Sequence, residues 1–392
     1  MKKVVFVINN LGTGGVQSSL LNLLAELKGN FHITVLCFDE RLKSSSNVLP
    51  PHINLLVPSS PFRYLGISQG ELRGKTTKYL ARAFWAFLTK LLGRSFVIRM
   101  MLPFQKKLGD YDCAISYLHE ASQKSFYGGC NEFVLKKIKA KKKVTWLHCD
   151  FELCGANSKA SEKIYQQFDE IVACSEGTKR AFLHCMPQFE DKCVAIRNCN
   201  DYENIRRLAG DGIPYDKSEF NIVTVARLSK EKGIERAIEA VKRCVKKGYQ
   251  LHYHIVGSGD QAVYLKKLTE DYGLENVITF YGNQSNPYPY MKNADLFLLP
   301  SYHEAAPMVF DEAACLGVPI LATETTSTDE MITESGSGFV CENSQDGIAD
   351  GLMKVLKNPD SLVEIKKSLQ QRQFTNQDKI NKVSEVINGQ HF

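Results

Sequence analysis

The sequence lacks an apolar run long enough to cross a membrane, and none of its cysteines form a CxxC pair. Its most apolar stretch, from Phe84 to Leu102, is interrupted by three cations, so no window offers the roughly 20 apolar residues that a spanning helix needs. The twelve cysteines are spaced irregularly between Cys37 and Cys341, unlike a secreted disulfide scaffold. We therefore expect reduced thiols in a cytoplasmic protein that is soluble or peripheral to a membrane.

Proline and glycine are also sparse, at 13 and 27 of 392 residues, and 44% of the residues are hydrophobic. This composition excludes a disordered, collagenous or low-complexity chain. The length exceeds that of one ordinary core and predicts two domains. We place the first domain at 1–198, a polar, turn-rich linker at 199–219 and the second domain at 220–375. The charged helix expected at 376–392 is not assigned to a domain.

Short β-branched runs alternate with longer amphipathic ones, which is typical of a parallel sheet covered by helices. The fold class predicted from this pattern is α/β, with two Rossmann-like doubly wound domains facing a cleft. A midpoint linker argues against a single eightfold barrel. The expected strands are Val4–Ile8, Ile33–Phe38, Ile53–Val57, Cys113–Tyr117, Val144–Leu147, Ile171–Ala173, Val194–Ile196, Ile222–Val225, His252–Val256, Val277–Phe280, Leu296–Leu299, Ile320–Ala322 and Gly338–Cys341.

Two loops that follow strands are candidates for binding an anion. In the first, Gly12, Gly14 and Gly15 precede a helix, whose N-terminus favours a phosphate. A plain tight turn also needs glycine, and the GxGG spacing matches no dinucleotide or phosphate-loop motif. In the second, Arg227 and Lys232 follow the strand Ile222–Val225, at the sheet edge where α/β domains bind ligands. These two cations suit a diphosphate, although a solvated basic loop has the same composition.

The segment from Ala294 to Thr325 carries two glutamates eight positions apart. Glu304 lies in the loop after a buried strand, and Glu312 lies on a short helix among apolar residues. A carboxylate in such surroundings needs to point outward or to find a partner, and the vicinal hydroxyls of a ribose or hexose are suitable donors. If the same two carboxylates were the acid and nucleophile of a glycosidase, they would have to flank one glycosidic bond. The neighbouring cations disfavour this alternative.

These motifs together resemble the retaining glycosyltransferases of the GT-B fold, their fourth sequence family, also called group 1. The two glutamates with the alanine-rich turn and GxP that follow, GTGG after the first strand, ARLSKEKG, VGSGD and WLHCDF occur in the family's order over nearly the whole chain. The resemblance implies that Glu312 binds the nucleotide ribose and that Glu304 lies near the donor-sugar hydroxyls. Arg227 and Lys232 would neutralise the leaving diphosphate without a metal or other cofactor.

The resemblance extends to the first domain and to the chemistry. Gly14 and Gly15 would let that domain close over the diphosphate, and His148 would lie near the transferred sugar or the acceptor as a catalytic group. The donor would be a UDP- or GDP-linked sugar. No zinc set is formed by His148, Cys149 and Cys154, because a fourth ligand at a suitable spacing is absent.

The chain departs from the family pattern at two places. Ala305 and Ala306 follow the first glutamate, where glycine is usual, and Thr326 and Ser327 replace a glycine pair that precedes the position of Glu330. These differences bear on recognition of the donor sugar.

A basic segment at 62–107 holds ten lysines and arginines against a single acidic residue, Glu71, with aromatic and aliphatic residues interleaved. This composition favours an amphipathic helix on an anionic membrane surface. An ordinary helix pair with solvated cations is the main alternative, and we expect no nucleic-acid partner. The lysine-rich run 135–143 is interpreted as a solvated lead-in to a buried strand.

The predicted function is transfer of a sugar from a nucleoside-diphosphate sugar to a glycan or lipid-linked acceptor during polysaccharide or glycolipid assembly, at the inner face of the cell membrane. The alternative is a non-catalytic GT-B subunit that holds a partner transferase.

Overall fold

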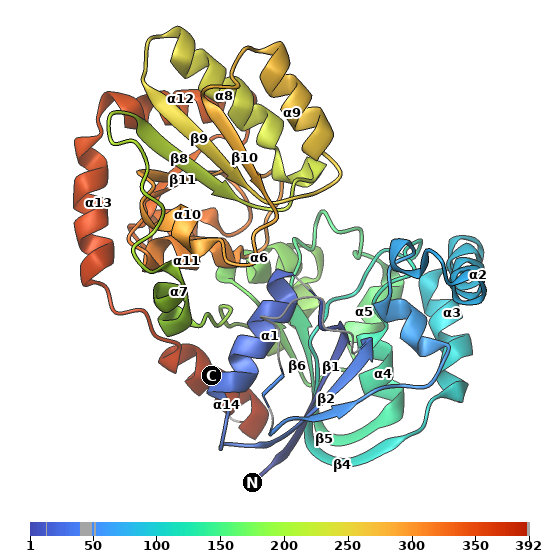
Figure 1. The fold of residues 1–392 in the computed structure, drawn as a ribbon. Helices are drawn as coiled ribbons and strands as arrows, with labels where there is room; N and C mark the ends of the chain where they lie inside the picture. Colours follow the sequence, from blue (N-terminus) through green and yellow to red (C-terminus); the bar gives the residue numbers. More distant parts are fainter. Residues whose placement is uncertain (13, 40–48, 51, 390–392) are drawn as a thin grey trace. The chain divides into compact units, whose positions relative to one another are not determined.

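The computed structural model describes residues 1–12, 14–39, 49–50 and 52–389. They form two compact units (Figure 1): unit 1 comprises Met1–Cys199 and Asn376–Phe392, and unit 2 comprises Asn200–Thr375. Among the described residues, no helix is long and apolar enough to span a bilayer.

Unit 1 is built on a seven-stranded parallel sheet in the order β3-β2-β1-β4-β5-β6-β7. Its strands are β1 (Lys3–Asn10), β2 (His32–Asp39), β3 (Asn54–Leu56), β4 (Leu108–Ser116), β5 (Ile138–Leu147), β6 (Glu170–Ala173) and β7 (Cys193–Ala195). Its helices are α1 (Gly15–Glu26), α2 (Thr76–Leu92), α3 (Arg94–Met101), α4 (Cys130–Lys137), α5 (Lys159–Tyr165), α6 (Glu176–Cys185) and α14 (Gln377–Asn388).

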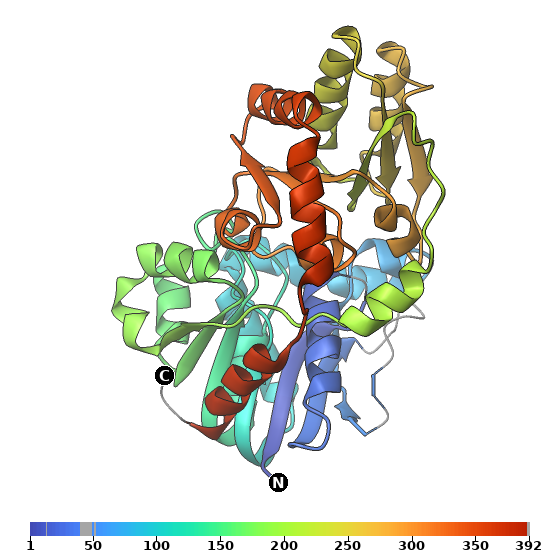
Figure 2. The ribbon, with the colours of Figure 1, turned by 90° about the vertical axis from the view of Figure 1, so that its left-hand side faces the viewer.

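Helices cover both faces of this sheet because its strands are apolar on both sides. On one face, α1 and α14 share a core with Val4, Phe6 and Ile8 of β1, and Figure 2 shows these two helices in front of the strands. On the other face, α3 and α4 pack on Val5 and Val7 of the same strand. The C-terminal helix, left unassigned by the sequence, is therefore part of unit 1.

Unit 2 contains a six-stranded parallel sheet in the order β10-β9-β8-β11-β12-β13. Its strands are β8 (Phe220–Val225), β9 (Leu251–Val256), β10 (Ile278–Gly282), β11 (Leu296–Leu299), β12 (Ile320–Thr323) and β13 (Gly338–Cys341). Its helices are α7 (Tyr202–Ala209), α8 (Ile234–Lys246), α9 (Ala262–Asp271), α10 (Tyr288–Lys292), α11 (Met308–Cys315), α12 (Gln345–Lys357) and α13 (Asp360–Gln371). Helices α8, α9 and α12 cover one face, and α7, α10 and α11 pack on the other.

The two sheets confirm the predicted fold class of two Rossmann-like doubly wound domains, and each expected strand overlaps an observed one. The segment 199–219, which was expected to be a linker, is assigned differently in the structure. From Asn200 onward it belongs to unit 2, and α7 buries Tyr202, Ile205 and Ala209 in the core of that unit. The polar composition of the segment concealed these three apolar positions, which lie on one face of a helix.

The lysine-rich run 135–143 is not a lead-in to a strand, as expected, but the end of α4 and the first half of β5. Two of its exposed lysines pair with carboxylates on the neighbouring strand: Lys139 bonds Asp110 at 3.0 Å, and Lys141 bonds Asp112 at 2.7 Å. Lys137 and Lys143 are half-buried and donate to backbone carbonyls at 2.9 Å. These cross-strand pairs allow a charged sequence to continue the ladder.

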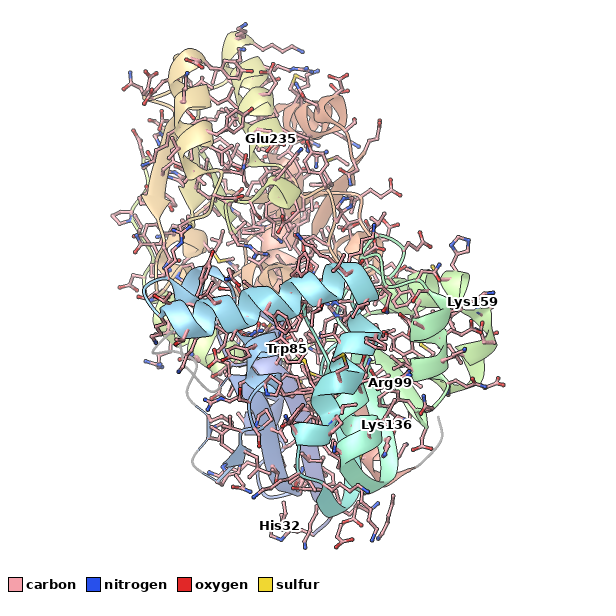
Figure 3. All side chains as sticks on the ribbon, turned by 90° about the vertical axis from the view of Figure 1, so that its right-hand side faces the viewer. His32, Trp85, Arg99, Lys136, Lys159 and Glu235 are labelled. Atoms are coloured by element: carbon pink, nitrogen blue, oxygen red, sulfur yellow. The ribbon has the colours of Figure 1, made fainter. Side chains whose placement is uncertain are left out.

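The basic segment forms α2 and α3 together with short 3₁₀ turns (Figure 3). Arg94, at the start of α3, is not part of a solvated basic surface, because its side chain is fully buried and pairs with Glu120 and Glu132. A buried guanidinium needs such carboxylates, since an unpaired charge there would be strongly destabilising. The exposed cations of the segment include Lys75, Lys78, Lys90 and Arg99.

Candidate active site

Strand order places several predicted residues at one edge of unit 2. The chain turns from β8 to β9 on one side of β8, while β11 pairs with its other side. Loops that leave β8 and β11 at their carboxyl ends therefore diverge, and α/β sheets bind ligands at such a switch point. Arg227 and Lys232 lie in the loop after β8, and Glu304 lies in the loop after β11.

Lys232 and Glu304 form a salt bridge across these two loops. Both side chains are largely buried, with 20% and 11% of their surfaces exposed. The Ser301 hydroxyl also donates to the Glu304 carboxylate, at 2.7 Å. The sequence predicted these two residues separately, and the structure joins them into one charged pair.

The loop after β8 is braced by the VGSGD turn. A Cβ on Gly257 would lie 1.9 Å from the carbonyl oxygen of Ala226, and one on Gly259 would lie 2.1 Å from that of Leu228. The Leu228 N–H donates to the Ser258 carbonyl at 2.9 Å. Only glycine permits this close approach of two backbones, so the turn fixes the loop that carries Arg227.

The loop after β11 is fixed from the other side by Arg236 of α8. Its guanidinium lies 3.7 Å from the centre of the Tyr302 ring and donates to the carbonyl of Pro300 at 2.5 Å. The Tyr302 hydroxyl in turn donates to Glu235 at 2.9 Å. Cation–π contacts of a shielded arginine are worth about 2 kcal/mol, which helps to hold Glu304 in place.

Arg227 is placed differently from Lys232. Its side chain is 71% exposed and pairs with the Glu231 carboxylate at 3.1 Å. Exposed pairs of this kind contribute about 1 kcal/mol or less. The Arg227 guanidinium is therefore easily released to another anion.

Glu312 lies on α11 and is half-buried. Burial and the neighbouring Asp311 carboxylate raise the pKa of Glu312 to about 7. Asp311 itself accepts bonds from Asn200 at 3.3 Å and from the Tyr202 hydroxyl at 3.2 Å. Within the described residues no side chain pairs with the Glu312 carboxylate. It is a partly protonated group that can still accept hydrogen bonds.

Two of the residues that depart from the family pattern, Ala305 and Ser327, contact each other. The Ser327 hydroxyl donates to the carbonyl oxygen of Ala305, and Ser327 is buried. Thr326 and Ala306 are half-buried beside them, and Glu330 lies in a π-helical turn at Asp329–Thr333. A serine in place of glycine thus adds a hydroxyl that holds the backbone next to Glu304.

In unit 1 the predicted glycine loop follows β1, the strand at the switch point of that sheet. Gly14 is the N-cap of α1 and supplies no side-chain cap, and a Cβ on Gly15 would meet only open space. The Asn10 side chain accepts from the Gly12 N–H at 3.1 Å. Thr13 lies outside the described residues. The first turn of α1 therefore keeps an accessible, positive end.

His148 lies directly after β5 and is half-buried, with its ring 4.6 Å from that of Tyr117. Burial lowers the pKa of His148 to about 3, and its buried Nε2 has no hydrogen-bond partner among the described residues. His119, which the sequence analysis missed, follows β4 and lies close enough to His148 for their charges to interact. Burial and the Arg94 charge lower its pKa to about 4, and its Nδ1 is also unpartnered. Both rings are neutral groups with free bonding capacity at the edge of the sheet.

Comparison with known proteins identifies the second unit. Residues 212–372 match the model of the family described as Glycosyl transferases group 1. The second unit is therefore similar to the group 1 glycosyltransferases along most of its length. The resemblance of the sequence to group 1 glycosyltransferases is thereby confirmed.

Curated relatives of the group 1 domain agree with this assignment. A putative colanic acid biosynthesis glycosyltransferase of Escherichia coli is 32% identical over 142 residues, which are 34% of this chain and 35% of that protein. The match thus spans about a third of the length of such relatives. The N-acetylgalactosamine-N,N'-diacetylbacillosaminyl-diphospho-undecaprenol 4-alpha-N-acetylgalactosaminyltransferase of Campylobacter jejuni is 23% identical over 360 residues, 91% of each chain.

Solved structures share the fold of both units. A complex of Anabaena HepE with UDP-glucose covers 99% of this chain and all of its own, at 18% identity and a TM-score of 0.69. The galactosyltransferase WaaB of the lipopolysaccharide outer core covers 99% of both chains, at 16% identity and a TM-score of 0.65. The chain therefore has the GT-B fold.

Proposed function

We propose that this protein is a retaining glycosyltransferase that moves a sugar from a nucleoside-diphosphate sugar to a glycan or lipid-linked acceptor. The observation that carries the proposal is the Lys232–Glu304 pair, held at the switch point of a group 1 glycosyltransferase domain. A scaffold protein has no physical reason to maintain a largely buried cation and carboxylate at this edge.

In the proposed mechanism, Lys232 and Arg227 bind the diphosphate. Arg227 exchanges a weak, exposed partner for a bidentate contact with phosphate. Lys232 keeps Glu304 in place until the donor arrives and then contacts the phosphate oxygens as well. Charge that develops on the leaving diphosphate is stabilised by these two groups, so the reaction as proposed needs no metal or other cofactor.

Glu312 and Glu304 bind the two sugar portions of the donor. The half-buried Glu312 carboxylate accepts from the ribose hydroxyls, and Glu304 accepts from hydroxyls of the transferred sugar. In unit 1, the first turn of α1 at Gly14 and Gly15 contributes N–H groups, and His148 contacts a sugar or acceptor hydroxyl through its unpartnered Nε2.

Bond formation and cleavage take place on the same face of the donor sugar. The acceptor hydroxyl oxygen bonds to the anomeric carbon while the bond from that carbon to the phosphate oxygen breaks. The hydroxyl proton passes to the departing phosphate. Positioning and charge stabilisation are then the main sources of rate enhancement.

Calorimetric titration with UDP, GDP and their sugar conjugates tests the donor site. Lys232→Ala is expected to weaken binding roughly 10- to 100-fold, the cost of one lost charge-assisted contact. Lys230→Ala removes an exposed cation two residues away and serves as the matched control. Binding should survive EDTA. Equal affinities of the Lys232→Ala protein and the wild type would refute the proposed donor site.

We further propose that the acceptor is membrane-anchored and that α2 holds the protein on the cytoplasmic face of the bilayer. Leu80, Phe84, Phe87 and Leu91 recur at helical spacing on α2, and all four are more than half exposed. We call these four residues the apolar stripe. On other sides of the same helix, Trp85 and Leu88 pack against the core of unit 1, and Figure 3 labels Trp85.

The charges around the apolar stripe favour an anionic membrane as its partner. Lys75, Lys78 and Lys90 are exposed on the same helix or at its start, and Arg99 is exposed on α3. Each cation near an anionic surface contributes about 1 kcal/mol, and each apolar side chain that becomes fully buried contributes roughly 1.5–3 kcal/mol. The two terms together suffice for reversible attachment.

Vesicle co-sedimentation tests this surface. The wild type is expected to bind phosphatidylcholine vesicles that contain phosphatidylglycerol, and to bind less at high salt. Serine at all four positions of the apolar stripe should abolish binding. The matched control, Val263→Ser with Tyr264→Ser, removes two exposed apolar residues of unit 2 and should bind as the wild type does. Undiminished binding without the stripe would contradict the proposal.

A further inference from the structure

Two cysteines of unit 1 lie with their sulfur atoms in contact. Cys149 follows His148 at the end of β5, and Cys154 lies five residues further along the loop. Their Sγ atoms are 3.3 Å apart, and both residues are partly exposed. Neither residue has a role in the transfer mechanism proposed above, so the contact between the two thiols needs a separate explanation.

The loop between the two cysteines is tightly held. The Cys154 N–H donates to the Asp150 carbonyl at 3.0 Å, and the Asp150 carboxylate accepts from the Glu152 N–H at 3.1 Å. Phe151 is fully buried, with its ring 4.9 Å from that of Phe182 on α6. These contacts close the chain into a turn that keeps the two sulfurs side by side.

The two thiols also differ in acidity. Burial raises the pKa of the Cys149 thiol well above its usual range. The pKa of Cys154 is lowered, chiefly by the hydrogen bond from the Cys149 thiol. A thiolate attacks disulfides and a thiol does not, so Cys154 is the better nucleophile of the pair and Cys149 is placed to react second.

We propose that Cys149 and Cys154 form a site of reversible disulfide modification, with glutathione disulfide as the oxidant. The Cys154 thiolate attacks one sulfur of glutathione disulfide, which forms a mixed disulfide and releases one glutathione thiolate. Cys149 loses its proton to solvent and attacks the Cys154 sulfur, which forms the Cys149–Cys154 bond and releases the second glutathione. Two protein thiols are oxidised, and one glutathione disulfide is reduced to two thiols.

The bond requires only a local change. The sulfurs must approach to about 2 Å, which a modest rotation of both side chains and a small movement of the exposed loop can supply. The ring of Phe151 anchors the middle of the turn in either state. Closing so short a loop costs little chain entropy beyond what the existing turn has already lost.

The modification acts on the neighbouring histidine. Cys149 is bonded through the backbone to His148, whose ring rests against Tyr117 at 4.6 Å. A pull on Cys149 towards Cys154 changes the position of that ring. This consequence rests on the proposed function, in which His148 contacts sugar or acceptor, and it predicts that oxidation lowers the transfer rate about tenfold or more.

Peptide mapping by mass spectrometry tests the site without an activity assay. The folded protein is equilibrated with mixtures of glutathione and glutathione disulfide, alkylated and digested. A Cys149–Cys154 linked peptide is expected to accumulate as the disulfide fraction rises and to disappear with dithiothreitol. Cys185→Ser removes a partly exposed thiol that packs near this loop and should leave the linked peptide unchanged. Failure of the linked peptide to form, or a link from Cys154 to Cys185 instead, would overturn the proposal.

A second readout separates this inference from the proposed function. Cys149→Ser and Cys154→Ser proteins should keep the transfer rate of the reduced wild type and lose its sensitivity to glutathione disulfide. Full activity of an oxidised protein that carries the bond would refute the coupling to His148. A linked peptide in a protein that transfers no sugar would refute the proposed function and leave the modification site standing.

Discussion

The chemistry of the Glu312 carboxyl depends strongly on its surroundings. With its pKa raised to about 7 by burial and by Asp311, it is half protonated near neutral pH. A ribose hydroxyl donates to the ionised form, so binding favours loss of that proton. Nucleotide affinity should therefore rise with pH through this range.

We predict an increase of about tenfold in UDP or GDP affinity from pH 6 to pH 8, if binding returns the carboxyl to its usual pKa. The titration of the nucleotide phosphate contributes equally in every variant. Glu312→Gln should remove this rise in affinity, apart from the contribution of the nucleotide phosphate, while Glu334→Gln, at an exposed position on the same unit, should keep it. Isothermal titration calorimetry at both pH values measures the nucleotide affinities. An identical dependence of affinity on pH for the wild type and Glu312→Gln would contradict the assigned role.

Single residues also mark the limit of prediction from sequence. Glu312 stood out as a carboxylate in an apolar segment, and Lys232 as a cation in the loop after a strand, whereas the role of Glu304 was implied by the resemblance to the glycosyltransferase family. His119 was missed because nothing in its local sequence distinguishes it from an ordinary loop residue after a strand. Its position near His148 depends on β4 lying beside β5 in the sheet, and the order of strands in a sheet is a tertiary property.

At the scale of elements, the VGSGD turn between β9 and α9 determines where Arg227 lies. Gly259→Ala should displace the backbone at Leu228, destabilise unit 2 by roughly 1–3 kcal/mol and weaken nucleotide binding. Gly109→Ala is a suitable control, because its Cβ would meet no atom within 4 Å. Chemical denaturation and nucleotide titration measure the two effects. An unperturbed Gly259→Ala protein would mean that the turn does not brace the loop.

The positions of the strands and helices were easier to predict than the residues at which they begin and end. Apolar, β-branched runs located the strands because both faces of each central strand are buried. The first half of β5 escaped detection because its lysines carry charge at exposed ladder positions. Helix α7 escaped because its three buried residues are separated by charged ones.

At the scale of the whole molecule, the last helix of the chain stabilises the unit that contains the first strand. Ile380, Val383, Val386 and Ile387 of α14 are buried in the core of unit 1, together with Leu20 and Leu24 of α1. No periodicity in the sequence records which of two similar units a terminal helix joins. The amphipathic pattern predicts only that a partner exists.

Removal of residues 376–392 is therefore expected to destabilise unit 1 selectively. Four buried side chains at about 1.5–3 kcal/mol each correspond to a loss of roughly 6 kcal/mol or more. Differential scanning calorimetry should show a lower melting temperature for unit 1 and little change for unit 2. Equal shifts of both transitions, or none, would contradict the assignment of α14.

The central claim is that the charged edge of unit 2 serves sugar transfer from a nucleotide donor. Its most direct test is to incubate the protein with a panel of UDP- and GDP-linked sugars and with undecaprenyl-diphosphate-linked or glycan acceptors. Proton NMR then measures consumption of the donor and the anomeric configuration of the product. We predict that one donor is consumed, that the anomeric configuration of the donor is kept in the product, and that Glu304→Gln and Lys232→Ala each lower kcat/KM at least tenfold while Lys230→Ala does not. Transfer at the wild-type rate by the Glu304→Gln and Lys232→Ala proteins, or a product of inverted configuration, would contradict it.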